Sequence, residues 1–316
     1  MIWYVLRRLA AIAPILFGVS IVCFSFVHLA PGDAISAVTP DNATPELRAQ
    51  IREMYGYDQP LPVQYFRWLG LVLSGNFGTS ILTGRPVAGE VLRAVQNTAV
   101  LAIAAISLSL AAGLLMGLGA AYARSVWADR ALTAVGILGV SVPHYWTGMV
   151  LVAIFSVHLG VLPAMGMGSG GVGGQLIWDD LRFVILPAVT LSLIPTAIIS
   201  RSVRATVIEV RKQDFVQTLQ GVGLPGLRIF AHVAKNAAPT IIAVVGLQVA
   251  QLLGGSILVE TVFAWPGTGY LLNSAIASRD LPLLQGTILV LATFFVLMNF
   301  LVDLMQPLLD PRIARE

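Results

Sequence analysis

Residues 211–239 read RKQDFVQTLQGVGLPGLRIFAHVAKNAAP, and this stretch holds both lysines of the chain, Lys212 and Lys235. Glycines and a proline divide it into two short segments, and strongly apolar runs flank it on either side. A basic loop between two apolar runs is typical of a chain that crosses a membrane and returns. The fold class therefore depends on how many such runs the sequence contains.

The composition indicates a membrane protein. Of the 316 residues 57% are hydrophobic and only 11% are charged, and the mean hydropathy is +0.83. A soluble domain of this length needs far more charge to cover its surface. The single cysteine, Cys23, excludes an intramolecular disulfide, and its apolar neighbours favour a packing role.

Runs without charge locate the spans, since a bilayer core of about 30 Å requires roughly 20 apolar residues per helix. The run at 131–178 is too long for one helix, but its Gly-rich part from Gly166 is unsuited to a membrane, so we expect one helix at about 132–160 followed by a loop. Six spans result. The charge-free runs are 9–32, 94–123, 131–178, 183–200, 236–259 and 281–302.

We therefore predict an all-α integral membrane protein with six transmembrane helices. The N-terminal apolar run is too long for a signal sequence and lacks a small-x-small cleavage site, so it is expected to remain as an anchor. The predicted parts are an N-terminal tip and first helix (1–32), an external insert (33–93), a core (94–305) with helices at about 97–121, 132–160, 183–201, 239–260 and 282–304 and a loop at 202–238, and a tail (306–316).

The distribution of Lys and Arg predicts the orientation. If both termini lie on one side, that side carries twelve of the 19 basic residues and the other side carries seven, together with ten carboxylates. Positive residues accumulate on the cytoplasmic side of membrane proteins. Both termini and the stretch 211–239 are thus expected in the cytoplasm, with the insert 33–93 outside.

The stretch 211–239 predicts two short helices. In its first half, apolar residues at i, i+1, i+4 and i+7 form one stripe, which must be buried against a partner or in lipid: Phe215, Val216, Leu219 and Val222. Gly221 and Gly223 are expected to stop this helix. The second helix would lie on the membrane surface and carry Arg228, His232 and Lys235, and Pro239 would mark the beginning of the fifth span. The residues alone leave open whether this loop docks a partner or only connects two spans.

An external turn and a few intramembrane polar residues are further candidate sites. Trp265 and Pro266 begin a turn in which Gly267 and Gly269 could adopt positive φ, so that the chain doubles back. This turn is either functionally constrained or only a connection. Gln248, Gln251 and Asn299 are polar and uncharged, and they either line a path or pack between helices.

The sequence argues against four other kinds of site or protein. Neither lysine follows a glycine, so the phosphate-binding loop of an ATPase is missing, and no histidines stand at the spacing of a zinc site. A stand-alone secondary carrier is the main alternative class, but such carriers usually keep ionisable residues deep in the membrane, whereas Glu260 and Asp303 lie at span ends. A membrane-embedded hydrolase would have to rely on Ser141 and His144, which have no accompanying carboxylate.

Residues 214–224, DFVQTLQGVGL, resemble the Glu-Ala-Ala loop of ABC importer permeases, which is approximately D-Y-V-R-T-A-R-A-K-G-L in the closest family. That family comprises the dipeptide, oligopeptide, nickel and glutathione permeases, and the match is to the first of its two permease subunits. YVLRRLAAIAPILFGVSIVCFSFVHLAPGDA, YDQPLPVQY, GNFGTS, ILPAVTLS and GLQVAQLLGGSILVETVFAWPGTGYLL extend the resemblance over nearly the whole chain.

The loop departs from the family pattern in its charge. Gln217 and Gln220 replace the two arginines, Val222 replaces the lysine, and Leu219 and Gly221 replace alanines. Charge pairing with an ATPase is therefore in doubt at this helix. The backbone-determining residues are kept, together with the first polar positions: Asp214, Thr218, Gly223 and Leu224.

The resemblance implies the type I ABC importer permease fold in a bacterial inner membrane. It implies a second homologous permease, two ATP-binding subunits that carry ATP and Mg, and an extracytoplasmic solute-binding protein. This chain would bind no cofactor, metal or nucleic acid, would contact membrane lipid, and would catalyse no reaction itself. The substrate would be a dipeptide, oligopeptide, glutathione, nickel chelate or opine.

Overall fold

The computed structural model describes residues 2–29, 44–46, 58–123, 125–127, 130–131, 134, 142–168 and 178–309. Within these ranges the regular structure is helical, and the only β pairing there is an isolated bridge between Thr79 and Pro86. The predicted all-α class is confirmed.

Five helices in this part of the chain are long and apolar enough to cross a bilayer, and they correspond to five of the six predicted spans. The predicted third span, 132–160, lies partly outside the described residues. Its described part is helical and consists of α6 (His144–Leu151) and a π-helix (Val152–His158). The five helices are α1 (Ile2–Leu29), α4 (Val87–Ala121), α7 (Leu181–Arg211), α9 (Gly226–Val262) and α11 (Leu281–Leu309).

The helices extend beyond the apolar runs that predicted them. Helix α4 contains 35 residues and is therefore about 52 Å long at 1.5 Å per residue, which exceeds the roughly 30 Å hydrocarbon core. It begins at Val87, within the predicted external insert, and α7 continues to Arg211, within the predicted loop 202–238. Hydropathy marks the part of a helix that lies in lipid, whereas backbone hydrogen bonding continues past the first charged residues.

The chain divides into two compact units. One contains residues 98–265 and 298–316, and the other contains residues 2–97 and 266–297. Helices α4 and α11 each contribute residues to both units. Of the predicted insert 33–93, residues 33–43 and 47–57 lie outside the described part, as do residues 310–316 of the predicted tail.

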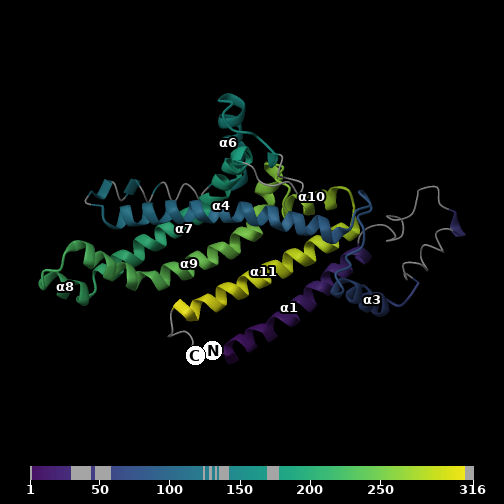
Figure 1. Cartoon of the computed structure of the whole chain (residues 1–316), viewed down its shortest axis with the longest axis horizontal. Helices are drawn as coiled ribbons and strands as arrows, with labels where there is room; N and C mark the ends of the chain where they lie inside the picture. Colours follow the sequence, from purple (N-terminus) through teal and green to yellow (C-terminus); the bar gives the residue numbers. More distant parts are fainter. Residues whose placement is uncertain are drawn as a thin grey trace. The chain divides into compact units, whose positions relative to one another are not determined.

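Helix α7 is the central helix of the first unit. In the most apolar stretch of α7, 61% of the residues are buried, whereas the corresponding stretches of the other four candidate spans are 11–22% buried. Helices α6 and α9 both pack against it, and the short α8 (Asp214–Gly221) joins α7 to α9 at one end, as Figure 1 shows. Leu186, Leu191, Val259 and Phe263 lie in the core between these elements.

Two glycines allow α4 to approach α7 closely. A Cβ added at Gly113 would lie 2.8 Å from the Ile199 side chain, and one at Gly117 would lie 2.6 Å from the Ser200 carbonyl oxygen. Gly113 and Gly117 form a GxxxG motif, which serves packing within this chain. Small residues at such a crossing let two backbones come together, which stabilises helix pairs in a bilayer.

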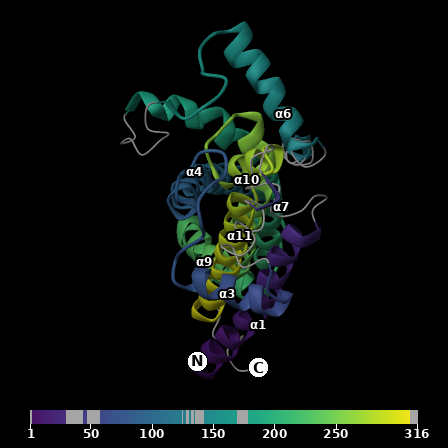
Figure 2. The same cartoon turned by 90° about the vertical axis from the view of Figure 1, so that its right-hand side faces the viewer.

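The second unit is built around α1, α3 (Leu61–Leu73), α10 (Thr268–Ala277) and the first parts of α4 and α11. Helix α3 lies against α1, as Figures 1 and 2 both show. Tyr65 is the residue that joins them: its hydroxyl lies 2.7 Å from Ser20 Oγ, and its ring meets the Phe24 ring edge-on at 5.5 Å.

The α4–α7 crossing yields a stability prediction. Gly117→Ala places a methyl group against a carbonyl oxygen that cannot move independently of α7, so we expect a loss of roughly 1–3 kcal/mol. Gly254→Ala is the matched control, because a Cβ at Gly254 meets nothing within 4 Å and alanine favours a helix. Thermal unfolding of the purified protein should show a lower Tm for Gly117→Ala only. Equal Tm values for both variants would contradict the close crossing.

Candidate functional site

Helix α8 carries the candidate coupling residues. It begins after Gln213, whose backbone is extended (φ −70°, ψ 149°), and Asp214 places a carboxylate in its first turn. A negative charge at a helix N-terminus is favourable because of the helix dipole. The Thr218 hydroxyl donates to the Asp214 carbonyl oxygen at 3.0 Å, one turn back.

Gly223 ends this helix as the sequence indicated. It adopts φ +79° and has open space around its Cα. Its N–H donates to the Gln220 carbonyl at 2.9 Å, and the Leu224 N–H donates to the Leu219 carbonyl at 3.1 Å. These two bonds form a Schellman motif, which satisfies the last carbonyls of the helix and turns the chain. The glycine is required by its left-handed conformation.

The predicted apolar stripe of α8 does not have a single environment. Val216 is 1% exposed and packs in this chain's own core with Val210 and Val233, and Phe215 packs beside it. Val222, at the other end of the stripe, is 73% exposed. The expectation that the whole stripe requires an external partner or lipid is therefore wrong, because the flanking helices α7 and α9 bury half of it. Leu219 is half-buried between these extremes.

The predicted second surface helix is the first part of α9. This helix begins at Gly226 and continues through Pro239 to Val262 without a break, so Pro239 lies inside the helix rather than at its beginning. A proline inside a membrane helix removes one hydrogen bond, and neighbouring groups can satisfy the freed carbonyl. The basic residues Arg228, His232 and Lys235 are exposed on this continuous helix.

Arg211, the last residue of α7, links α7 to the end of α4 and, through Tyr122, to α9. Its guanidinium donates to the Ala121 carbonyl, the last residue of α4, at 2.7 Å. Its Cζ also lies 4.3 Å from the centre of the Tyr122 ring, and that ring is 5.9 Å from the Phe230 ring on α9. Sequence reasoning counted Arg211 only as a cytoplasmic charge. No local pattern signalled this role, since its partners lie far away along the chain.

The external turn differs from its prediction. Gly267 has φ −95° and ψ −173°, which is extended backbone, and Gly269 lies within α10. The predicted positive φ at both glycines is wrong. The left-handed residue is Ala264, with φ +45°. It occupies the Schellman position after α9, where the Trp265 N–H donates to the Glu260 carbonyl at 2.8 Å.

Buried contacts hold this turn. Trp265 is fully buried, and so is Glu260, whose carboxylate accepts a hydrogen bond from Thr98 Oγ1 at 2.9 Å. The neighbouring Asn97 donates through Nδ2 to the Pro266 carbonyl at 2.8 Å. Glu260 lies in the last turn of α9, and its burial and its partner on α4 could not be seen from the sequence.

Asp280 fixes a second corner, between α10 and α11. It is 1% exposed, and one of its oxygens accepts from Ser80 Oγ at 2.5 Å and from the Leu82 N–H at 3.3 Å. Its other oxygen accepts from the Leu283 N–H at 3.2 Å in the first turn of α11. Sequence analysis missed this residue, although Asp before an apolar run is a common helix cap.

The polar residues proposed to line a path are only partly brought together. Gln248 is 2% exposed, and its Nε2 donates to Oε1 of the exposed Gln251 at 3.2 Å. Asn299 is half-buried on α11. Whether these residues line a path stays a prediction.

The other candidate chemistry has little support in the described residues. Of the proposed hydrolase pair, Ser141 lies outside them, and His144 Nε2 is buried without a hydrogen-bond partner among them. Within the same ranges, no three His, Cys, Asp or Glu side chains gather into a potential metal site.

Comparisons with known proteins agree over the full length. Residues 109–315 match the family described as binding-protein-dependent transport system inner membrane component, and residues 1–110 match its N-terminal region. The dipeptide transport system permease protein DppB of Alkalihalophilus pseudofirmus is 36% identical and covers 99% of both chains. The di/tripeptide transport system permease protein DppB of Pseudomonas aeruginosa is 36% identical, and the dipeptide transport system permease protein DppB of Escherichia coli is 35% identical, each over 100% of both chains.

A solved structure supports the fold. A chain from inward-facing conformations of the MetNI methionine ABC transporter has a TM-score of 0.52 and covers 69% of this chain and 94% of its own length. The sequence identity is 16%, so this likeness concerns the fold alone.

The Ala264 conformation yields a prediction. A non-glycine residue in the left-handed region carries a penalty of about 1–2 kcal/mol, so Ala264→Gly should raise the Tm of the purified protein. Ala231→Gly is the matched control: Ala231 is exposed within α9, where glycine costs roughly 0.5–1 kcal/mol. Opposite shifts of the two Tm values are expected. A lower Tm for Ala264→Gly would show that Ala264 is not strained.

Proposed function

Because the chain belongs to the family of binding-protein-dependent transport system inner membrane components, we propose that it is one permease subunit of an ATP-driven importer of short peptides. The observation that carries this proposal is the full-length match to dipeptide and di/tripeptide permeases. The family is one of transport permeases, which agrees with a chain that is not itself an enzyme. Glutathione, nickel chelates and opines are the other solutes that the family resemblance implies, and the relatives' names favour peptides.

The substrate would pass between this chain and a second, homologous permease. A solute-binding protein would deliver the peptide on the outer side, and two ATP-binding subunits carrying ATP and Mg would drive the cycle from the cytoplasm. This chain would bind no cofactor. Its part is to present a path to the substrate and to convert movements of the ATPases into movements of its spans.

Helix α8 is suited to receive those movements. Its buried side is fixed in the core through Val216, so a push on the helix is transmitted to α7 and α9. Its other side is free for a partner and is mostly uncharged: the exposed residues include Gln217, Thr218, Gln220, Gly221 and Val222, and Leu227 follows at 80% exposure. Contact through these groups would tolerate salt, whereas charge pairing would be screened.

The proposed orientation has both termini in the cytoplasm. The unequal distribution of Lys and Arg supports it. On this arrangement α8 faces the ATPases, and the turn at Trp265 to Gly269 and the corner at Asp280 face outward, toward the binding protein.

The transport proposal is tested with membrane vesicles that contain both permeases and both ATPases. Dipeptide uptake should require ATP, the binding protein and this chain. Vesicles containing only this chain should take up none. ATP-independent uptake by this chain alone would identify a secondary carrier and overturn the proposal.

The docking of α8 is tested by cross-linking. In a Cys23→Ser background, cysteine at Val222 should cross-link to cysteines on the ATPase surface with a yield that depends on bound nucleotide. Cysteine at Val126, which is 64% exposed in another loop, is the control. Val222→Asp should lower peptide-dependent ATP hydrolysis roughly tenfold, equivalent to about 1.4 kcal/mol of coupling. Equal cross-linking at Val222 and Val126 would show that α8 has no special contact with the ATPase and would contradict the docking proposal.

The topology is tested by labelling with an impermeant thiol reagent. Single cysteines replace Leu82 and Gln217, which are both exposed. In intact cells the reagent should modify the cysteine at Leu82 and leave the one at Gln217 unmodified until the membrane is opened. The reverse pattern would invert the proposed orientation.

A further inference from the structure

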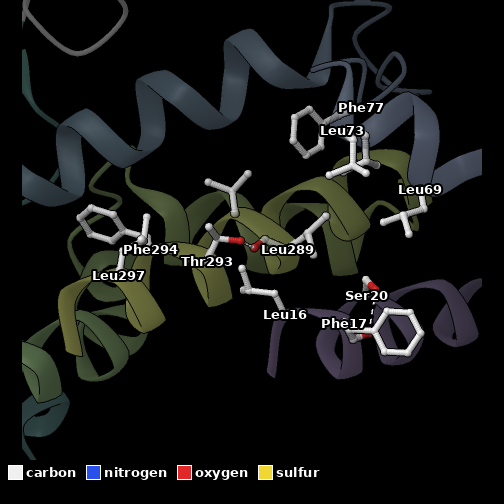
Figure 3. A pocket seen from close by; sticks show the side chains of 12 residues that line it. Leu16, Phe17, Ser20, Leu69, Leu73, Phe77, Leu289, Thr293, Phe294 and Leu297 are labelled. Carbon is white, nitrogen blue, oxygen red and sulfur yellow. Dashed lines mark hydrogen bonds between the residues drawn. The ribbon is translucent and has the colours of Figure 1, made fainter. Parts of the chain in front are cut away.

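The second unit contains an apolar cavity. Its volume is about 480 Å³, and it is partly open. Figure 3 shows side chains from α1, α3 and α11 around it. The lining residues are Leu16, Phe17, Ser20, Leu69, Val72, Leu73, Phe77, Leu289, Val290, Thr293, Phe294 and Leu297.

The polar atoms of the lining are already engaged within the chain. Ser20 Oγ donates to the Phe17 carbonyl at 2.7 Å and also meets Tyr65 OH, and Thr293 Oγ1 donates to the Leu289 carbonyl at 2.8 Å. A peptide or a water cluster would find few partners here, because buried polar groups require hydrogen bonds. The cavity therefore suits an occupant that has no polar groups at all.

Two of the helices around the cavity are candidate membrane spans, so lipid rather than water is expected to reach it. Helices α1 and α11 are both candidate spans, and the lining residues that they contribute fall within the candidate ranges Arg7–Phe26 and Leu281–Leu301. The two helices meet where Gln285 Nε2 donates to the Cys23 carbonyl at 3.2 Å, and α3 contributes the wall formed by Leu69, Val72 and Leu73. The cavity extends along α11 from Leu289 to Leu297, which is about 12 Å at 1.5 Å per residue.

We propose that this cavity is a binding site for one acyl chain of a membrane phospholipid. An apolar cavity of about 150 Å³ accepts one benzene molecule. The volume here is about three times larger, which is enough for a segment of an acyl chain rather than for one small molecule. A transmembrane helix, with a diameter of about 10–12 Å, is too wide to enter such a space. The acyl chain fills the gap between α1 and α11 and holds α3 against both.

The test uses the assembled transporter in vesicles of phosphatidylcholine with a small fraction that carries a diazirine in the acyl chain. After exchange into unlabelled lipid and irradiation, mass spectrometry maps the adducts. Adducts at Leu16 and Phe294 should exceed those at Ile15 roughly tenfold. Ile15 is 50% exposed on α1 and does not line the cavity.

Two neighbouring residues of α3 provide matched variants. Val72→Phe fills the cavity and should reduce the adducts at Leu16 and Phe294 to the Ile15 level. Leu71→Phe, at an exposed position outside the lining, should leave them unchanged. Thr293→Leu fills the cavity from α11 and replaces Val72→Phe if that variant does not assemble.

Three results would overturn the proposal. The first is that the lining residues carry no more adducts than Ile15 does. The second is that the adducts at the lining residues persist in the variant whose cavity is filled. The third is that cysteines at Leu16 or Phe294 cross-link to the second permease chain, which would make the cavity part of a protein interface.

Discussion

Backbone hydrogen bonding at the helix ends is the constraint on which the rest of this structure depends. Within a bilayer a helix satisfies its own amide groups except in its first and last turns, and those ends require partners from the chain. Schellman motifs supply them at four corners, where the residue after the helix end has positive φ: Gly75, Gly223, Ala264 and Arg279. The corner at Gly223 sets the direction of α9 relative to α8, and the corner at Arg279 sets the direction of α11 relative to α10.

The spans could be predicted from sequence because apolar surface in lipid leaves long runs without charge. Gly223 could be identified because glycine is the usual residue with left-handed backbone. Ala264 could not, since its conformation comes from the surrounding burial of Trp265 and Glu260 rather than from its own preference. The same limit applies to Gly267 and Gly269, where glycine suggested a conformation that the chain does not adopt.

The apolar stripe of α8 illustrates what periodicity can and cannot establish. The spacing of Phe215, Val216, Leu219 and Val222 shows that one face is apolar, but the same pattern fits packing against a partner, lipid or neighbouring helices. In the structure the residues of the stripe have different environments: Val216 is buried inside this chain, whereas Val222 is exposed. Long-range contacts such as Arg211 to Ala121 decide the division, and they leave no periodic signal.

The π-helix after α6 has a consequence for how related chains compare. From Val152 to His158 the backbone hydrogen bonds join residues that are five positions apart. An example is the hydrogen bond from the Leu159 N–H to the Ile154 carbonyl at 2.9 Å. Each such turn accommodates one residue more than an α-helical turn. A chain shorter by one residue here can keep the same faces toward its neighbours by reverting to α-helix. Alignments of homologues should therefore allow a one-residue gap inside this span, where gaps are otherwise avoided.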